Sequence, residues 1–332
     1  RQHCDWSPDR GLPGIIPAGL SLGICGVNAW GPDIGGFFDA SDGSASARSK
    51  ELWIRWCQFG ALTPIMRDHL GTKRLTTPDA VDLWTDAETV TVWRRYARLH
   101  NALLPYLYAY AQVAHETGVP TMRHLVLSWP DDPEALRQVH EYLLGEDLLV
   151  APVVMEGATS CRVYFPAGEW YSFWDDSVYR GPEYRIVPAP LEQIPLFVRG
   201  PSILPLLAEP VVTLATMAPK ELLASLQLRL YPARDGAPNG RFRFHDATEV
   251  HCQATPDGWR ITLPAPPSRR YLLRLPARLD VWSIQAQGHF LREGETDGNE
   301  PGWWRDPSDR ACWIRLRPGT ADVQVHVRPE EN

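Results

Sequence analysis

Polar side chains stand where two short apolar runs of the sequence end. The first run closes with Asp33, which is followed by Gly35 and Gly36, and the second closes with Arg67 and His69. A carboxylate followed by two glycines, which let the backbone approach closely, fits a position that faces a substrate. In an α/β barrel, the rim at the strand ends holds the chemistry. The pattern therefore predicts that these side chains gather on a substrate-facing rim.

Helix and strand patterns alternate around these residues. Residues 11–24 are typical of a short helix and residues 27–30 of a buried strand. Residues 46–59 indicate a second helix, because their apolar positions recur with helical spacing. This order indicates consecutive β-α-β units, in which polar residues follow the strands.

The strongest helical pattern covers residues 86–117. It begins with Thr85-Asp86-Ala87-Glu88, which has the form of a capping box, and is closed by Gly118 and Pro120. Pro105 lies inside this segment. We expect it to bend the helix, because proline removes one backbone donor.

After residue 118 the pattern changes to short apolar or alternating runs separated by Gly, Pro and Asp, which is typical of antiparallel β structure. A further domain boundary is predicted between residues 206 and 216. The predicted strands cover residues 122–127, 147–154, 161–165 and 194–198 before that boundary, and 260–265, 271–276, 311–316 and 322–328 after it.

Five blocks of the sequence resemble the C-terminal part of glycoside hydrolase family 31, the retaining α-glucosidases and their relatives. Two of them are the rim segments, Asp-Ile-Gly-Gly-Phe at residues 33–37 and Met-Arg-Asp-His at residues 66–69, with Arg55-Trp56 between them. The other three blocks cover residues 143–153, 163–170 and 194–199. The blocks occur in the family's order across residues 1–205, and the resemblance is faint beyond residue 205.

The resemblance implies that the rim segments end the seventh and eighth strands of a (β/α)8 barrel. Only these two strand candidates and about three helices precede the β region, whereas eight strands close such a barrel. The predicted fold class is therefore α/β plus all-β. Residues 1–118 are expected to be the C-terminal remnant of a (β/α)8 barrel, followed by two antiparallel β-sandwich-like domains over residues 119–206 and 207–332.

The resemblance also implies retaining hydrolysis of α-linked glycosides by two aspartates, a nucleophile and an acid/base, without a metal or other cofactor. Both aspartates are expected before residue 1. An alternative alignment matches Trp6-Ser7-Pro8-Asp9 to the acid/base pattern, with Pro8 in the place of a glycine, and makes Asp9 the acid/base. The favoured interpretation is that Asp9 caps or opens the helix over residues 11–24.

Four residues match substrate-binding positions at the family's first sugar subsite: Asp33, Phe37, Arg67 and His69. Asp33 could accept hydrogen bonds from sugar hydroxyls or orient a catalytic neighbour, or it could cap the loop or pair with Arg55. Phe37 could pack against the C–H face of a sugar or belong to the core. Arg67 could contact the sugar or hold an acidic neighbour. For His69, substrate contact is favoured over a structural role.

The segment Asp5-Trp6-Ser7, with Gly11-Leu12-Pro13 after it, is similar to sulfoquinovosidases, the branch of the family that cleaves sulfonated sugars. That branch carries tyrosine where this chain has Phe37. The sequence therefore leaves sulfonated sugars, glucosides and xylosides open as substrates.

Composition limits the classes of partner. The formal net charge of -7 argues against nucleic acid and anionic membranes. The six cysteines are scattered without a C-x-x-C pair, which argues against a metal site and a disulfide framework. No apolar run has the length of a membrane span, and the first residues do not resemble a signal peptide, so a cytoplasmic location is favoured.

The sequence thus predicts the C-terminal part of a retaining α-glycosidase that is inactive alone. Its expected partners are a carbohydrate substrate and the missing N-terminal portion of the barrel. The alternative is a non-catalytic carbohydrate-binding or scaffold subunit of a split or truncated glycosidase. Four tryptophans could form an accessory sugar surface, although core packing is favoured for them: Trp170, Trp174, Trp303 and Trp304.

Overall fold

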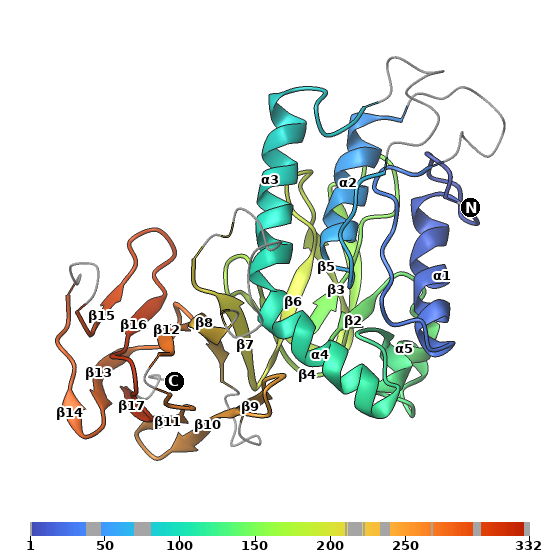
Figure 1. Ribbon diagram of the computed structural model, residues 1–332. Coiled ribbons are helices and arrows are strands. Elements are labelled where there is room, and N and C mark those ends of the chain that lie inside the picture. The colour runs from blue at the N-terminus through green and yellow to red at the C-terminus, as the bar shows by residue number, and fades with distance from the viewer. Residues whose placement is uncertain are drawn as a thin grey trace. The chain divides into compact units, whose positions relative to one another are not determined.

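The computed structural model describes residues 2–37, 48–69, 81–209, 211, 221, 223–232, 240–266, 268–294 and 300–328. The chain forms two compact units, whose elements are labelled in Figure 1. The first unit comprises Arg1–His100, Tyr110–Gly168 and Arg180–Phe197, and the second comprises Asn101–Ala109, Glu169–Tyr179 and Val198–Asn332. The domain boundaries at residues 118 and 206 remain predictions.

The predicted helices over residues 11–24 and 46–59 correspond to α1 (Leu12–Ile24) and α2 (Lys50–Ala61). The Ser49 hydroxyl caps α2 by accepting a hydrogen bond from the Leu52 N–H at 3.2 Å. Ten of the twelve residues of α2 are buried, from Leu52 to Ala61. A helix that is apolar around most of its surface must be enclosed by other elements, so α2 lies at the centre of the first unit's core.

The predicted helix over residues 86–117 is two helices, α3 (Ala87–Ala102) and α4 (Leu104–Thr117), which are separated at Leu103. Pro105 has no N–H to give to the carbonyl of Asn101, four residues earlier, so the helical hydrogen bonding is interrupted at this point. The predicted cap was also wrong by one residue. Asp86 and Thr89 exchange hydrogen bonds between backbone N–H groups and side-chain oxygens, at 2.9 and 3.1 Å.

The predicted strand over residues 27–30 was wrong. Val27 is 44% exposed, and residues 27–30 are not part of any of the strands in the described structure. The backbone after Val27 instead runs beside residues 63–67. The Ile65 N–H donates to the Trp30 carbonyl at 3.1 Å and the Ile34 N–H to the Arg67 carbonyl at 3.3 Å. Asp33 and Arg67 are thus the partners of an isolated parallel bridge. The bridge does not extend into a ladder, because a ladder needs further residue pairs on either side of it.

The first sheet has the strand order β1-β2-β3-β6-β4-β5. Its strands are β1 (Met122–His124), β2 (Tyr142–Leu144), β3 (Leu148–Val150), β4 (Ser160–Ser172), β5 (Val178–Pro188) and β6 (Leu196–Gly200). The short helices η2 (Leu125–Leu127) and α5 (Pro133–Arg137) lie between β1 and β2 in the chain. The residues of β2 and β3 are buried throughout, so this part of the sheet forms a core layer.

Two further sheets belong to the second unit, with the orders β14-β13-β17-β11-β10-β9 and β15-β16-β12-β8-β7. Their strands are β7 (Ser202–Leu207), β8 (Ser225–Tyr231), β9 (Gly240–Arg243), β10 (Glu249–Thr255), β11 (Gly258–Thr262), β12 (Arg270–Leu275), β13 (Val281–Ala286), β14 (His289–Phe290), β15 (Gly302–Arg305), β16 (Cys312–Arg315) and β17 (Asp322–Val327). The β8–β12 pair is parallel. In β17, Val323 and Val325 are buried while Gln324 is partly exposed, as the alternation of the sequence predicts.

The architecture confirms the predicted fold class, a barrel remnant followed by β-sandwich-like structure. Two of the candidate tryptophans lie in the core, since Trp170 is 0% exposed and Trp303 is 3% exposed. In the described part of the chain, no helix is both long enough and apolar enough to cross a membrane.

Candidate functional site

Asp33 and Arg67 form an ion pair across the isolated bridge. The Arg67 Nη2 atom lies 2.6 Å from Asp33 Oδ1, and the two side chains are 47% and 15% exposed. The same two residues are the partners in the backbone bridge. The structure therefore overturns the alternative in which Asp33 pairs with Arg55, and it gives Arg67 an acidic neighbour to hold.

Phe37 and His69 form a second contact beside the first. Their ring centroids are 5.0 Å apart, with a tilt of 52°. Arg67 and His69 are both exposed, while Asp68 between them is partly buried, because alternate residues of an extended segment point to opposite sides. The structure thus brings the four predicted residues together as two contacting pairs on neighbouring segments.

The two glycines after Asp33 allow the turn that carries this site. Gly35 and Gly36 have φ values of +79° and +82°, a region that residues with a side chain rarely adopt. A Cβ on Gly36 would lie 2.8 Å from the backbone carbon and oxygen of His3, and one on Gly35 would lie 2.5 Å from the Arg48 side chain. The turn can pack this closely only because both positions lack a Cβ.

A buried arginine supports the turn from behind. Arg48 is 6% exposed, and it donates from Nη1 to the Ile34 carbonyl at 3.2 Å and from Nε to the Val81 carbonyl at 2.5 Å. Burial lowers the pKa of Arg48, and the charge of Asp68 opposes this shift. Burial raises the pKa of Asp68, against the influence of Arg48. Arg48 and Asp68 therefore influence each other's charge behind the exposed Arg67 and His69.

Sequence reasoning missed two residues that hold the site. The Gln2 side chain accepts a hydrogen bond from the Asp33 N–H at 2.8 Å, and the Gln2 carbonyl accepts one from the Phe37 N–H at 2.8 Å. Arg48 is the other residue. A single polar residue far from its partner in the chain carries no local pattern, so neither could have been found from spacing. The unusual burial of an arginine is visible only in the structure.

Asp9 does not cap α1. The N-cap residue is Gly11, with no side-chain hydrogen bond, and Asp9 forms an exposed ion pair with Arg10 at 3.2 Å. The helix starts instead with Pro13 in its first turn, where proline costs no hydrogen bond. The alternative role of Asp9 as an acid/base remains a prediction.

The site offers complementary groups for a polyhydroxylated ligand. The Asp33 carboxylate can accept hydrogen bonds from hydroxyls, while the exposed Arg67 and His69 can donate. The Phe37 ring, which is partly exposed, can contact a C–H face. This combination of a carboxylate, two nitrogen donors and one aromatic ring suits binding and orientation of a sugar ring.

Comparisons with known proteins match two consecutive stretches of the chain. Residues 5–110 match the profile of the glycosyl hydrolases family 31 TIM-barrel domain, and residues 118–204 match that of the glycosyl hydrolase family 31 C-terminal domain. Together the profiles cover more than half of the chain, and all four site residues fall within the first.

Curated relatives and solved structures agree with these profiles. The sulfoquinovosidase of Escherichia coli K12 is 38% identical over 60% of this chain and 29% of its own length. The α-xylosidase of Saccharolobus solfataricus is 34% identical over 73% of this chain and 31% of its own length. A Flavobacterium johnsoniae GH31 dextranase, solved with glucose, has a TM-score of 0.80 at 28% identity and covers 94% of this chain and 41% of its own. The chain therefore spans about 30% of the length of these curated relatives.

Proposed function

This chain belongs to glycoside hydrolase family 31, and from that premise we propose that Asp33, Phe37, Arg67 and His69 form one wall of the first sugar subsite of a retaining α-glycosidase. The observation that carries the proposal is the joining of these residues into two contacting pairs, Asp33 with Arg67 and Phe37 with His69. Relatives named for hydrolysis of different α-glycosides support the reaction class and leave the sugar open.

In this role Asp33 binds substrate and performs no proton transfer. Its Oδ1 atom lies 2.6 Å from Arg67 Nη2, and the oxygen atoms of a carboxylate can accept hydrogen bonds from hydroxyl groups. Retaining hydrolysis needs two carboxyl groups about 5 to 5.5 Å apart on either side of the glycosidic bond. The rim site offers Asp33, a partly buried carboxylate that is already paired with Arg67, so we expect the 332-residue chain to bind sugar without hydrolysing it.

Titration of the chain with methyl α-D-glucopyranoside, followed by NMR, tests the subsite. One wall of a site should bind weakly, with a dissociation constant of about 10 mM. Asp33→Asn and His69→Ala should each weaken binding by about tenfold, the equivalent of one lost hydrogen bond of about 1.4 kcal/mol. The matched control is His115→Ala, which removes an exposed histidine from α4 and should leave binding unchanged.

Two results would count against the proposal. Binding that survives both Asp33→Asn and His69→Ala would show that the sugar contacts other residues. Turnover of p-nitrophenyl α-D-glucoside by the purified chain, with the same rate lost in Asp9→Asn, would show that the chain holds its own catalytic carboxyls. The alternative function as a tryptophan-based binding module is not favoured, because Trp170 and Trp303 lie in the core.

A further inference from the structure

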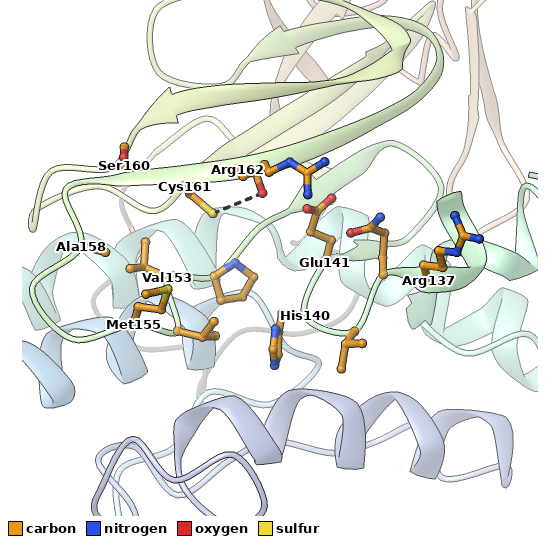
Figure 2. A pocket seen from close by; sticks show the side chains of 13 residues that line it. Arg137, His140, Glu141, Val153, Met155, Ala158, Ser160, Cys161 and Arg162 are labelled. Carbon is orange, nitrogen blue, oxygen red and sulfur yellow. Dashed lines mark hydrogen bonds between the residues drawn. The ribbon is translucent and has the colours of Figure 1, made fainter. Parts of the chain in front are cut away.

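The first unit contains a cavity of about 400 Å³ whose lining comes from three stretches of chain, residues 137–141, 152–158 and 160–162. Figure 2 shows aliphatic side chains, among them Val153 and Met155, on one side and Glu141 beside Arg162 on the other. The volume lies within the range of small-molecule sites, which combine apolar walls with a few polar groups. None of the four rim residues lines this cavity.

Glu141 is the buried polar group of the pocket, with 6% of its surface exposed. Both of its carboxylate oxygens accept a hydrogen bond from the same donor, the Tyr164 N–H, at 3.1 Å. A carboxylate has about four acceptor positions, so one N–H leaves most of this capacity unused. Burial raises the pKa of Glu141 to about 8, and Arg162 opposes the shift.

The positive groups near the pocket are engaged elsewhere. The Arg162 guanidinium lies 3.6 Å from the centre of the Tyr184 ring, and Arg137 forms an ion pair with Glu134. His140 hydrogen-bonds the Pro13 backbone, and burial lowers the pKa of its imidazole. Within the described residues, Glu141 has no lysine, arginine or histidine nitrogen at ion-pair distance, 4 Å or less. A buried acid without a counter-charge costs free energy, which a ligand can recover by supplying the charge.

We propose that this pocket binds a small aliphatic ammonium ion, whose charged group pairs with Glu141 while its hydrocarbon part lies against Val153 and Met155. The aliphatic lining favours a ligand with a hydrocarbon chain over a sugar. None of the thirteen lining residues is phenylalanine, tyrosine or tryptophan, the rings against which the C–H faces of sugars pack. The carboxylate without a counter-charge decides between a cation and an anion, because Glu141 attracts a cation and repels an anion once it is ionised, above about pH 8.

The proposal predicts a direction of pH dependence. The other titratable groups that line the pocket are Arg137, Arg162, His140 and Cys161. Burial raises the pKa of the Cys161 thiol to about 11, so the thiol stays neutral to pH 9. Below pH 8 most Glu141 is protonated, and the cation must displace that proton. Apparent affinity should therefore rise about tenfold per pH unit up to pH 8 and then level off, because an alkylammonium keeps its charge to about pH 10.

Calorimetric titration of the 332-residue chain with n-butylammonium chloride tests the proposal, with 1-butanol and sodium butyrate as neutral and anionic isosteres. Butylammonium should bind one to one, about 100-fold more tightly at about pH 9 than at about pH 6. Glu141→Gln should abolish the binding and its pH dependence, because it removes the carboxylate that pairs with the ammonium group. The fold should be retained, since the amide oxygen can still accept a hydrogen bond from the Tyr164 N–H. The matched control Glu156→Gln removes an exposed carboxylate beside Met155 and should change the affinity less than twofold.

Val139→Trp provides a second variant that leaves Glu141 in place. Val139 lines the pocket and is 51% exposed, so a larger side chain there should fill the cavity without disturbing the core. It should abolish butylammonium binding even if Glu141→Gln fails to fold. The proposal would be overturned by equal binding of butanol, by preferential binding of butyrate, by binding that survives Val139→Trp, or by no detectable binding of butylammonium at either pH.

Discussion

Replacement of Arg55 by methionine should strongly destabilise the first unit, because this buried arginine bridges α2 and four loop positions of the β region, Ala158, Ala189, Pro190 and Gln193. Arg55 is 2% exposed. Its Nη2 atom donates to the carbonyls of Ala158 at 3.0 Å and Ala189 at 2.8 Å, and its Nη1 atom to the carbonyl of Pro190 at 3.0 Å. Burial lowers the pKa of Arg55, and the charge of Glu51 opposes the shift. In the described part of the chain, carbonyl oxygens and not a carboxylate accept from the two terminal nitrogens of this guanidinium, while its Nε atom has no partner.

The cost can be worked from those contacts. Methionine is similar in length but has no donor, so the carbonyl of Ala189, which is 0% exposed, would lose its partner in the core. An unsatisfied buried carbonyl costs about 1–3 kcal/mol, and each lost bond from a charged donor about 1.5–3 kcal/mol. Relief from burying the charge offsets part of this, which leaves a net loss of about 3 kcal/mol in the free energy of unfolding. With a urea dependence of about 3 kcal/mol per molar, the unfolding midpoint should fall by about 1 M.

Urea unfolding followed by tryptophan fluorescence measures this loss, since Trp53 and Trp56 lie on the same helix. Arg98→Met makes the same chemical change on the exposed surface of α3 and should shift stability by no more than about 0.5 kcal/mol. Arg55→Lys should lose about half as much as Arg55→Met, because a compact ammonium cannot reach carbonyls on both sides of the planar group. An Arg55→Met midpoint within error of the Arg98→Met midpoint would refute the argument.

Three further outcomes are expected. The pKa of Glu141 rises on folding from 4.5 to about 8, so the folded state binds a proton that the unfolded state has lost. This contribution to the free energy of unfolding should be full below about pH 4.5 and decline by a few kcal/mol as the pH rises to 8. Glu141→Gln should remove this pH dependence from urea midpoints measured across the same range. Gly36→Ala should lower the free energy of unfolding by at least about 1 kcal/mol more than Gly118→Ala in the same assay. Both glycines have φ near +80°, but only at Gly36 would the added Cβ lie 2.8 Å from other backbone atoms. Equal losses would mean that the turn beside Asp33 is loosely packed. Arg274→Met should destabilise the second unit by about 3–5 kcal/mol. Arg274 binds Asp176 in a two-point contact at 2.9 and 3.0 Å, and Asp176 would remain buried without its partner. A loss no larger than that of the exposed Arg317→Met would contradict this interpretation.

Periodicity predicted elements whose apolar residues recur regularly along the chain. The helices α1 and α2 were found from apolar spacing, and the strand β17 from its alternation of valines with polar residues. Periodicity failed where pairing decides the structure. Residues 27–30 have the composition of a strand, yet strand structure depends on neighbours on both sides, and the bridge at Asp33 is isolated.

The site residues were predicted by resemblance, and the structure added how they are held. A motif places Asp33 and Arg67 near each other but does not state that they form an ion pair. Gln2 and Arg48 support the same turn from 31 and 14 residues away along the chain, through backbone contacts that any polar side chain of suitable length could make. Such partners depend on the tertiary fold, so a single sequence does not reveal them.

The isolated bridge between Asp33 and Arg67 also fixes the register of the two segments. If the second segment slipped by one residue, every side chain on it would change sides, so Arg67 would turn inward and Asp68 would face Asp33. Two carboxylates would then stand where an ion pair stands now, and the inner arginine, Arg48, would meet Arg67 in place of Asp68. The opposite charges of the neighbouring Arg67 and Asp68 therefore penalise misalignment on both faces at once. They give a contact of a single backbone pair a selectivity that its few hydrogen bonds could not supply.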